Sequence, residues 1–427
     1  MILKIYLLKA FIYLFFLTGF SELYAQIPAP AQSGPIALQG GTVVTVSGRT
    51  ITGGTVVFDN GIITGIGVDP VIPGGTEIID VSGKFVFPAM IHARSSLGLS
   101  EIGRVTETVD LDEHGIINPN VRAWVAFHAE SEHIPLARTH GIAVTVATPT
   151  GGIISGLSAA MLTSGWDWEE MTLHAPAGMV VNWPDMSDIE ERDKELKKLS
   201  EAFLAARRYK IAKQTDTGQG APYHKTDVRW EAMIPVLEGE VPVHVHADEI
   251  RQIQAAINWA EQENVRMVLV GGRDAGYLLP QLKEKDIPVI LTSIIGGPSR
   301  HWEGYDSSYS LPKKLYDAGI EYCIAGDFGA ANAIRLAHHP SSAVAFGLPQ
   351  EEAVRTITLY PARILGIEDR MGSIEKGKDA SLIVADGNIL ELSTRVEQVY
   401  IQGMHIDMYD KHRRLFEKYQ ERYIQMD

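Results

Sequence analysis

The feature that most constrains the fold of this 427-residue chain is a central stretch in which short apolar runs alternate with helical segments. The stretch is about 280 residues long, which is the length expected of a (β/α)8 barrel. A long, highly charged helix is predicted over 188–213, and its apolar residues are expected to face the core: Leu196, Leu199, Phe203 and Leu204. Barrel strands are predicted at 143–147, 178–182, 241–247, 266–270, 288–292 and 321–327.

Both ends of the mature chain are rich in β-branched and apolar residues, and they predict short strands rather than helices. Four such runs lie within 36–66, and Asp59-Asn60-Gly61 supplies the positive-φ residues of a tight hairpin between the last two. Further strand signals follow at 381–406. From Tyr409 onward, apolar residues spaced by four within a charged segment predict a helical tail.

Charge and cysteine content narrow the partners and the chemistry. A formal net charge of −15 and a pI near 5.4 argue against nucleic acid and anionic membrane surfaces as partners. Cys323 is the single cysteine, so the chain forms no intramolecular disulfide, and its apolar neighbours predict an inert core residue.

The N-terminal residues 1–25 have the pattern of a signal peptide. A short basic start is followed by an apolar run over 5–20, and Leu23-Tyr24-Ala25 forms a plausible cleavage site. The apolar run is short and broken by Lys9, which disfavours a retained membrane anchor, the alternative interpretation. The protein is therefore expected to be exported, to the periplasm or the medium, with no membrane contact after signal cleavage.

One motif ties the barrel to a known family. The run Val86-Phe-Pro-Ala-Met-Ile-His-Ala-Arg-Ser-Ser-Leu-Gly-Leu99 resembles the end of the first barrel strand in the amidohydrolase superfamily. The apolar, proline and glycine positions of that pattern are kept, but Arg94 and Ser96 stand where the family has two metal-binding histidines. A guanidinium offers no lone pair to a metal. The chain therefore resembles a metal hydrolase whose metal site is partly dismantled.

The C-terminal third carries the same resemblance over longer segments. Residues 348–366, 371–384 and 396–403 are similar to the helix pair, the re-entry motif and the last hairpin of the imidazolonepropionase- and prolidase-like branch. The resemblance implies an α/β fold: a distorted (β/α)8 TIM barrel with a small composite β-sandwich built from both chain ends. Applied to this chain, it implies a sandwich over 27–87 and 369–406, a barrel over 88–368 and a helical tail over 407–427.

The resemblance also implies chemistry, namely metal-assisted hydrolysis of C–N bonds at the C-terminal ends of the strands. On this pattern the chain keeps Asp327 on strand 8 as the general base and His246 on strand 5 as a ligand or electrophile. It has Gly271 where strand 6 would carry a histidine, and no lysine or glutamate at 178–182.

The remaining ligand positions allow two interpretations of the cofactor. His244 and His246 lie two apart on one strand and face the same side, so with Asp327 they form a candidate non-standard site for a single divalent metal such as zinc. In the alternative, His244 is an interior histidine one layer deeper and the chain binds no metal. The glycine-rich run 149–158 predicts either an anion-presenting loop at the barrel mouth or a tight loop between strands.

Arg94 has two interpretations as well. Its cation either replaces the missing metal and pairs with Asp327, or it points into solvent at the barrel mouth. At the level of function, one hypothesis is an exported hydrolase of C–N bonds in a small substrate. The other is a catalytically silent barrel that binds a small ligand or serves as a partner subunit, in a homo- or hetero-oligomer with a related amidohydrolase.

Overall fold

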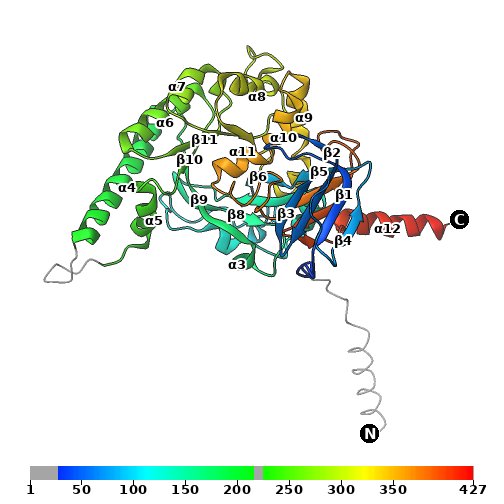
Figure 1. Ribbon diagram of the computed structural model, residues 1–427. Coiled ribbons are helices and arrows are strands. Elements are labelled where there is room, and N and C mark those ends of the chain that lie inside the picture. Colours follow the sequence, from blue (N-terminus) through cyan, green and yellow to red (C-terminus); the bar gives the residue numbers. More distant parts are fainter. Residues whose placement is uncertain (1–26, 216–224, 427) are drawn as a thin grey trace, which may run out of the picture.

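The computed structural model describes residues 27–215 and 225–426, so the predicted signal peptide lies outside the described residues. Two eight-stranded sheets organise the fold. Figure 1 shows the strands of the two chain ends, in blue and orange to red, on one side of the molecule, and the helices of the central stretch on the other. None of the described helices is long and apolar enough to cross a membrane.

The central stretch forms a nearly closed barrel sheet. Neighbouring strands run parallel except at one strand, β8, which is antiparallel to both of its neighbours. The two outer strands approach each other where the backbone N–H of Ser96 donates to the carbonyl of Phe328 at 2.8 Å. In spatial order the strands are β13 (Tyr322–Ile324), β12 (Val289–Leu291), β11 (Met267–Gly271), β10 (Val243–Ala247), β9 (Thr172–Asn182), β8 (Ile154–Leu162), β7 (Ile142–Ala147) and β6 (Met90–Ser95).

The antiparallel strand β8 is a departure from the expected alternation of strand and helix. Part of it falls in the run 149–158, which the glycines suggested to be a loop, yet every residue of β8 is buried. Antiparallel neighbours need no crossover helix, so a tight turn is enough between β7 and β8. The amide of Asn182 holds this turn by donating to the carbonyl of Gly152 and to Ser155 Oγ, both at 2.9 Å. The structure thus supports the tight-loop interpretation up to Ile153.

Helices surround the barrel and connect its other strands. They are α2 (His133–Thr139), α3 (Trp168–Met171), α4 (Ile189–Thr215), α5 (Val228–Leu237), α6 (Ile250–Glu263), α7 (Leu279–Glu284), α8 (Ser307–Ala318), α9 (His338–Ala345), α10 (Gln350–Arg355) and α11 (Leu359–Ile364). Short 3₁₀ turns lie at η1 (Thr106–Thr108), η2 (Ala123–Ala126), η3 (Ala275–Tyr277) and η4 (Ala330–Arg335).

The predicted long helix is confirmed as α4, with one error in its buried face. Leu199 and Phe203 are fully buried, whereas Leu204 is 46% exposed. Adjacent helical residues point about 100° apart, so Phe203 and Leu204 do not share one narrow contact face. Phe203 takes the core position because its ring meets that of Trp259 on α6 edge-on, with centroids 5.1 Å apart.

Strands from both ends of the chain pair in the second sheet. The predicted hairpin turn is confirmed, because Asn60 and Gly61 have φ angles of 50° and 78°. Hydrogen bonding joins all eight strands in one sheet, so a division into two sandwich layers stays a prediction. In order they are β16 (Met404–His405), β15 (Val396–Ile401), β14 (Leu382–Ala385), β5 (Phe85–Pro88), β1 (Ile36–Val43), β2 (Ile51–Asp59) and β3 (Ile62–Gly67), with β4 (Glu77–Asp80) also paired to β1.

The C-terminal tail is helical, as predicted, and forms α12 (Lys411–Ile424). It projects away from the body of the molecule (Figure 1), and none of its residues is buried. Asp410 fixes its start, because this carboxylate accepts from the backbone N–H of Arg413 and from Thr139 Oγ1 on α2.

Candidate functional site

Asp327 lies just beyond the C-terminal end of β13, on the face of the barrel where this architecture places its active sites. Its side chain is 23% exposed, and its Oδ2 lies 3.3 Å from Nη2 of Arg335 and 3.8 Å from Nε2 of His339. His339 itself is buried, and burial lowers its pKa while the Asp327 carboxylate raises it. The carboxylate is therefore held between two neighbours and open to the mouth.

The seam between β6 and β13 positions this carboxylate. Besides the backbone bond to Phe328, Ser96 accepts through Oγ from the backbone N–H of Ala330 at 2.9 Å. Ser96 is buried. The residue that replaces a metal ligand of the family thus holds in place the segment that directly follows Asp327.

Arg94 does not pair with Asp327, and the first interpretation of this residue is wrong. Its guanidinium lies over the ring of Phe328, with Cζ 4.2 Å from the ring centroid. The second interpretation is wrong too, because the residue is only partly exposed and its Nε is buried without a hydrogen-bond partner. Burial lowers the pKa of Arg94 to about 10, while the nearby charge of Asp248 raises it. The neighbouring Phe328 takes one face of the cation that was expected to meet the carboxylate.

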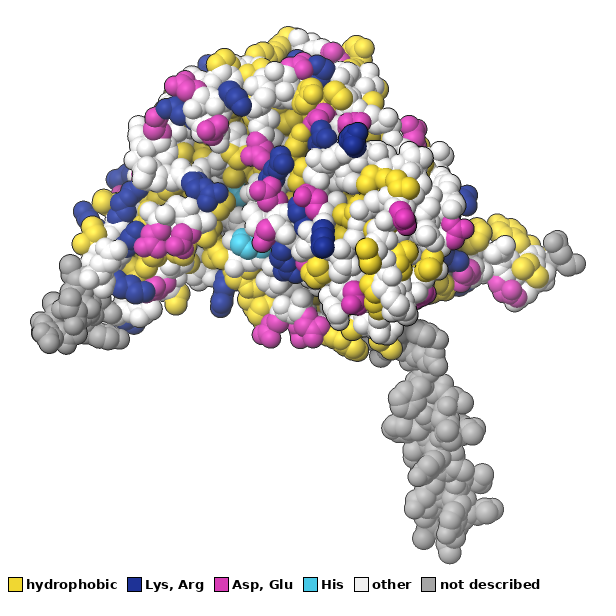
Figure 2. Space-filling view, in the orientation of Figure 1, with side chains coloured by type: hydrophobic (Ala, Val, Ile, Leu, Met, Phe, Trp, Pro, Cys, Tyr) yellow, Lys and Arg dark blue, Asp and Glu magenta, His cyan; other side chains and the backbone are white. Residues whose placement is uncertain are grey.

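Three histidines line the barrel interior beside Arg94. Burial lowers the pKa of His92 and of His244 to about 4. Burial also lowers the pKa of His246 well below its usual value, and the Arg94 cation lowers it further. All three imidazoles are therefore neutral at pH 7. In the view of Figure 2, histidine side chains are visible near the centre of the molecule, among charged side chains of both signs.

The two strand β10 histidines occupy different depths. His246 is partly exposed near the end of the strand, whereas His244 is 3% exposed and lies one layer deeper. The ring of His244 fills the space beside Gly178 on β9, where an added Cβ would come within 2.4 Å of Nε2. Only His246 is thus open to a molecule that enters from the mouth.

The donor set does not fit the metal centre of the resembled family. In residues 27–215 and 225–426, no group of three or more His, Cys, Asp or Glu side chains is placed to hold a metal ion. The candidate site of His244, His246 and Asp327 is therefore not assembled, since His244 is turned into the deeper layer and Asp327 is engaged by Arg335. Gly271 has a φ of 94°, a backbone conformation in which a histidine would be strained, and a Cβ there would also come within 2.7 Å of Oδ1 of Asp248.

We therefore expect the protein purified without chelator to carry clearly fewer than two metal ions per chain. The physical reason is that Arg94, Ser96 and Gly271 occupy ligand positions with groups that supply no donor to a metal or are already engaged. Elemental analysis by mass spectrometry measures this directly. Two tightly held zinc ions per chain would contradict the assignment of these three positions.

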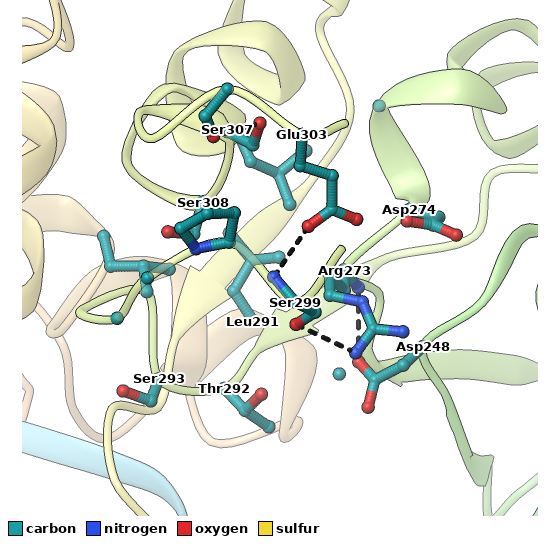
Figure 3. A pocket seen from close by; sticks show the side chains of 18 of the residues that line it. Asp248, Arg273, Asp274, Leu291, Thr292, Ser293, Ser299, Glu303, Ser307 and Ser308 are labelled. Carbon is teal, nitrogen blue, oxygen red and sulfur yellow. Dashed lines mark hydrogen bonds between the residues drawn. The ribbon is translucent and has the colours of Figure 1, made fainter. Parts of the chain in front are cut away.

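A polar cavity of about 270 Å³ opens beside this centre, over the ends of β10, β11 and β12. Figure 3 shows the Arg273 guanidinium donating to Ser299 Oγ and the backbone N–H of Arg273 donating to the Asp248 carboxylate. The backbone N–H of Ser299 donates to Glu303. Serine and threonine hydroxyls make up much of the remaining wall: Thr292, Ser293, Ser307 and Ser308. The cavity gives a small polar molecule room next to the barrel mouth.

The chain segment that covers this cavity is tied down by Arg300. Its guanidinium pairs with Asp274 at 2.9 Å, with Glu303 at 2.9 Å and with Glu249 at 3.5 Å. Asp274 is almost fully buried and also accepts from the backbone N–H of Ile250. The segment after β12 is thereby fixed to the segments after β10 and β11.

Sequence reasoning missed the residues that surround Asp327 and Arg94. His339 and Arg335 carry no ligand spacing and lie in a segment without a recognised motif. Phe328 could have been found, because it directly follows Asp327, and an aromatic ring there is well placed to stack on a cation from the neighbouring strand.

Known proteins of one family are similar to this chain. The model of the amidohydrolase family matches residues 313–406. An amidohydrolase of Hapsidospora irregularis, TasK, is 26% identical over 195 residues, and an imidazolonepropionase of Thermoplasma volcanium is 32% identical over 88 residues. These matches cover 45% and 19% of this chain, and each spans 20% of the relative's own length.

A solved structure extends the similarity to nearly the whole described chain. The crystal structure of an amidohydrolase from Thermotoga maritima MSB8 superposes with a TM-score of 0.80 at 26% identity. The superposition covers 87% of this chain and 99% of that one. In its barrel, its C-terminal motifs and these matches, the chain is similar to proteins of the amidohydrolase superfamily.

Proposed function

We propose that this protein hydrolyses a C–N bond, of the amide type, in a small substrate, and that Asp327 is the general base. The observation that carries the proposal is the Asp327 carboxylate, which lies at the C-terminal end of the last barrel strand between Arg335 and His339. Catalytic residues of this architecture come from the strand ends on this face. The family name shared by the similar proteins supports the same reaction class.

The reaction can be written with groups of this chain alone. Asp327 accepts a proton from water, the water oxygen attacks the carbonyl carbon, and the same carboxyl group then returns the proton to the leaving nitrogen as the C–N bond breaks. A neutral His246 can donate an N–H to the carbonyl oxygen as negative charge develops there. Its pKa is far below 7, so the imidazole is not itself the acid that loses a proton. No step is assigned to a metal, because the donor set does not fit one.

A second candidate function is favoured by the positions that replace metal ligands. Ser96 and Gly271 serve the packing of the barrel rather than chemistry. A barrel remodelled in this way can retain a ligand site without catalysis. In that case the protein binds a small molecule, or it serves as a partner subunit of a related amidohydrolase.

A substrate panel separates the two candidates. Purified protein is incubated with N-acetyl amino acids, dipeptides and N-acetylated amino sugars, and the released amine is quantified by fluorescence, with and without added zinc or manganese. We expect turnover of at least one compound, with a rate that a chelator leaves unchanged. No turnover on the whole panel under every condition, together with ligand-dependent increases in the melting temperature, would favour the binding protein.

A further inference from the structure

Arg94 is a partly exposed cation near the C-terminal end of β6, without a counter-ion in contact with it. No ion pair within 4.0 Å and no hydrogen bond involves its side chain in the described part of the chain, and its Nε is buried. One face of the guanidinium is covered by the ring of Phe328. The edges of the group, which carry the N–H donors, are therefore the part left for a partner.

The nearby carboxylates do not fill this role. Asp327 is engaged by Arg335 and His339. Asp248 attracts Arg94 electrostatically but makes no ion pair with it. The Oδ1 atom of Asp248 accepts from the backbone N–H of Arg273 at 3.3 Å. A largely buried charge without a contact partner is costly, and structures normally supply an anion at such a place.

We propose that Arg94 binds a carboxylate group of the substrate, so that the substrate is an acidic amide such as an N-acylated amino acid. The planar guanidinium, with one face on Phe328, presents its N–H groups in the plane that suits two-point binding of a planar carboxylate. A phosphate dianion suits the place less, because the carboxylates of Asp327 and Asp248 add negative charge near it. That the bound molecule is a substrate rests on the proposed hydrolase function. The carboxylate site itself does not depend on it.

The Arg94 cation also lies near the proposed catalytic groups. His246 feels the Arg94 cation, and Asp327 directly precedes the residue on which the guanidinium lies. A molecule whose carboxylate contacts Arg94 thus places its amide next to the proposed base and electrophile. Arg94 is therefore a substrate-binding residue. Its charge also acts on the reacting bond, because of where the residue lies.

The test is a calorimetric titration with three probes: N-acetylglycine, its neutral counterpart N-acetylglycinamide, and inorganic phosphate. We expect wild-type protein to bind N-acetylglycine at least about tenfold more tightly than the neutral amide, which is the effect of one charge-assisted pair. In Arg94→Gln the preference should fall to about one, and in Arg94→Lys, which keeps the charge but not the fork, it should be intermediate. Arg229→Gln removes an arginine from the exposed start of α5 and should leave the preference intact.

Several outcomes overturn the proposal. Equal wild-type affinity for N-acetylglycine and its neutral amide would do so without any variant, and phosphate binding more tightly than N-acetylglycine would refute the carboxylate class. An unchanged preference in a folded Arg94→Gln protein would remove Arg94 from the site. The substrate panel tests the hydrolase proposal separately. Turnover of neutral amides alone would contradict only the proposed carboxylate site. A carboxylate preference without turnover would contradict only the proposed hydrolase function.

Discussion

Replacing Asp327 by asparagine is expected to lower kcat for any substrate of this protein by about 10²- to 10⁴-fold. Asparagine keeps the shape of the side chain and can still lie near Arg335, but its amide does not accept a proton from water. KM should change little, because the proposed binding groups are His246 and Arg94 rather than Asp327. The measurement is a comparison of initial rates over a range of substrate concentrations, with the compound that the panel identifies.

The matched control is Asp317→Asn. Asp317 is an exposed carboxylate on α8 that pairs with Lys313, so the substitution makes the same chemical change away from the barrel mouth. Its kcat should equal that of the wild type. An Asp327→Asn protein with wild-type kcat would rule out Asp327 as the base and, with it, the mechanism that the family resemblance implies.

The barrel could be predicted from sequence because its strands are short apolar runs with clear boundaries. The predicted strand over 241–247 contains β10, and the one over 321–327 contains β13 and ends at Asp327. The order of strands around β8 could not be predicted in the same way. Its glycines and hydroxyls look like a loop, and only the hydrogen bonds to β7 and β9 along both of its edges make it a strand.

The site was predictable as far as position on a strand decides it. Asp327 and His246 lie at strand ends on one face, as their places in the sequence indicated. Contacts between side chains could not be predicted, because they depend on segments that the fold brings together. Arg94 was expected to meet Asp327, but the structure sets the ring of Phe328 against the cation and gives the carboxylate to Arg335 and His339.

The buried histidines lead to the second large effect: the free energy of unfolding should fall steeply as the solution is acidified from pH 7 to pH 5. His92 and His244 have pKa values of about 4 in the folded protein, against an ordinary value of 6.5 that applies when the chain is unfolded. Between these values the unfolded chain binds a proton that the folded chain excludes. Stability therefore decreases as pH falls through 6.5, and the loss is complete near pH 4.

The magnitude follows from the gap between the two pKa values. Each histidine should remove about 2 kcal/mol of stability between pH 7 and pH 5, so the two together remove about 4 kcal/mol. Carboxylates with ordinary pKa values near 4 contribute little between pH 7 and pH 5, so the change in stability over this interval reports on the histidines. Urea unfolding at pH 7, 6 and 5, followed by circular dichroism, gives the free energy at each pH.

Single variants assign the effect to the interior. His244→Gln removes one titrating ring beside Gly178 and should reduce the loss between pH 7 and pH 5 by about 2 kcal/mol, the share of that ring. His412→Asn, a change on the exposed helix α12, should leave the loss unchanged. A flat free energy of unfolding over this range, or an unaltered slope in His244→Gln, would show that these rings are protonated in the folded barrel. In that case His246, one layer above His244 and beside the Arg94 cation, would lose its role as a neutral electrophile, because that role depends on an interior that keeps imidazoles uncharged.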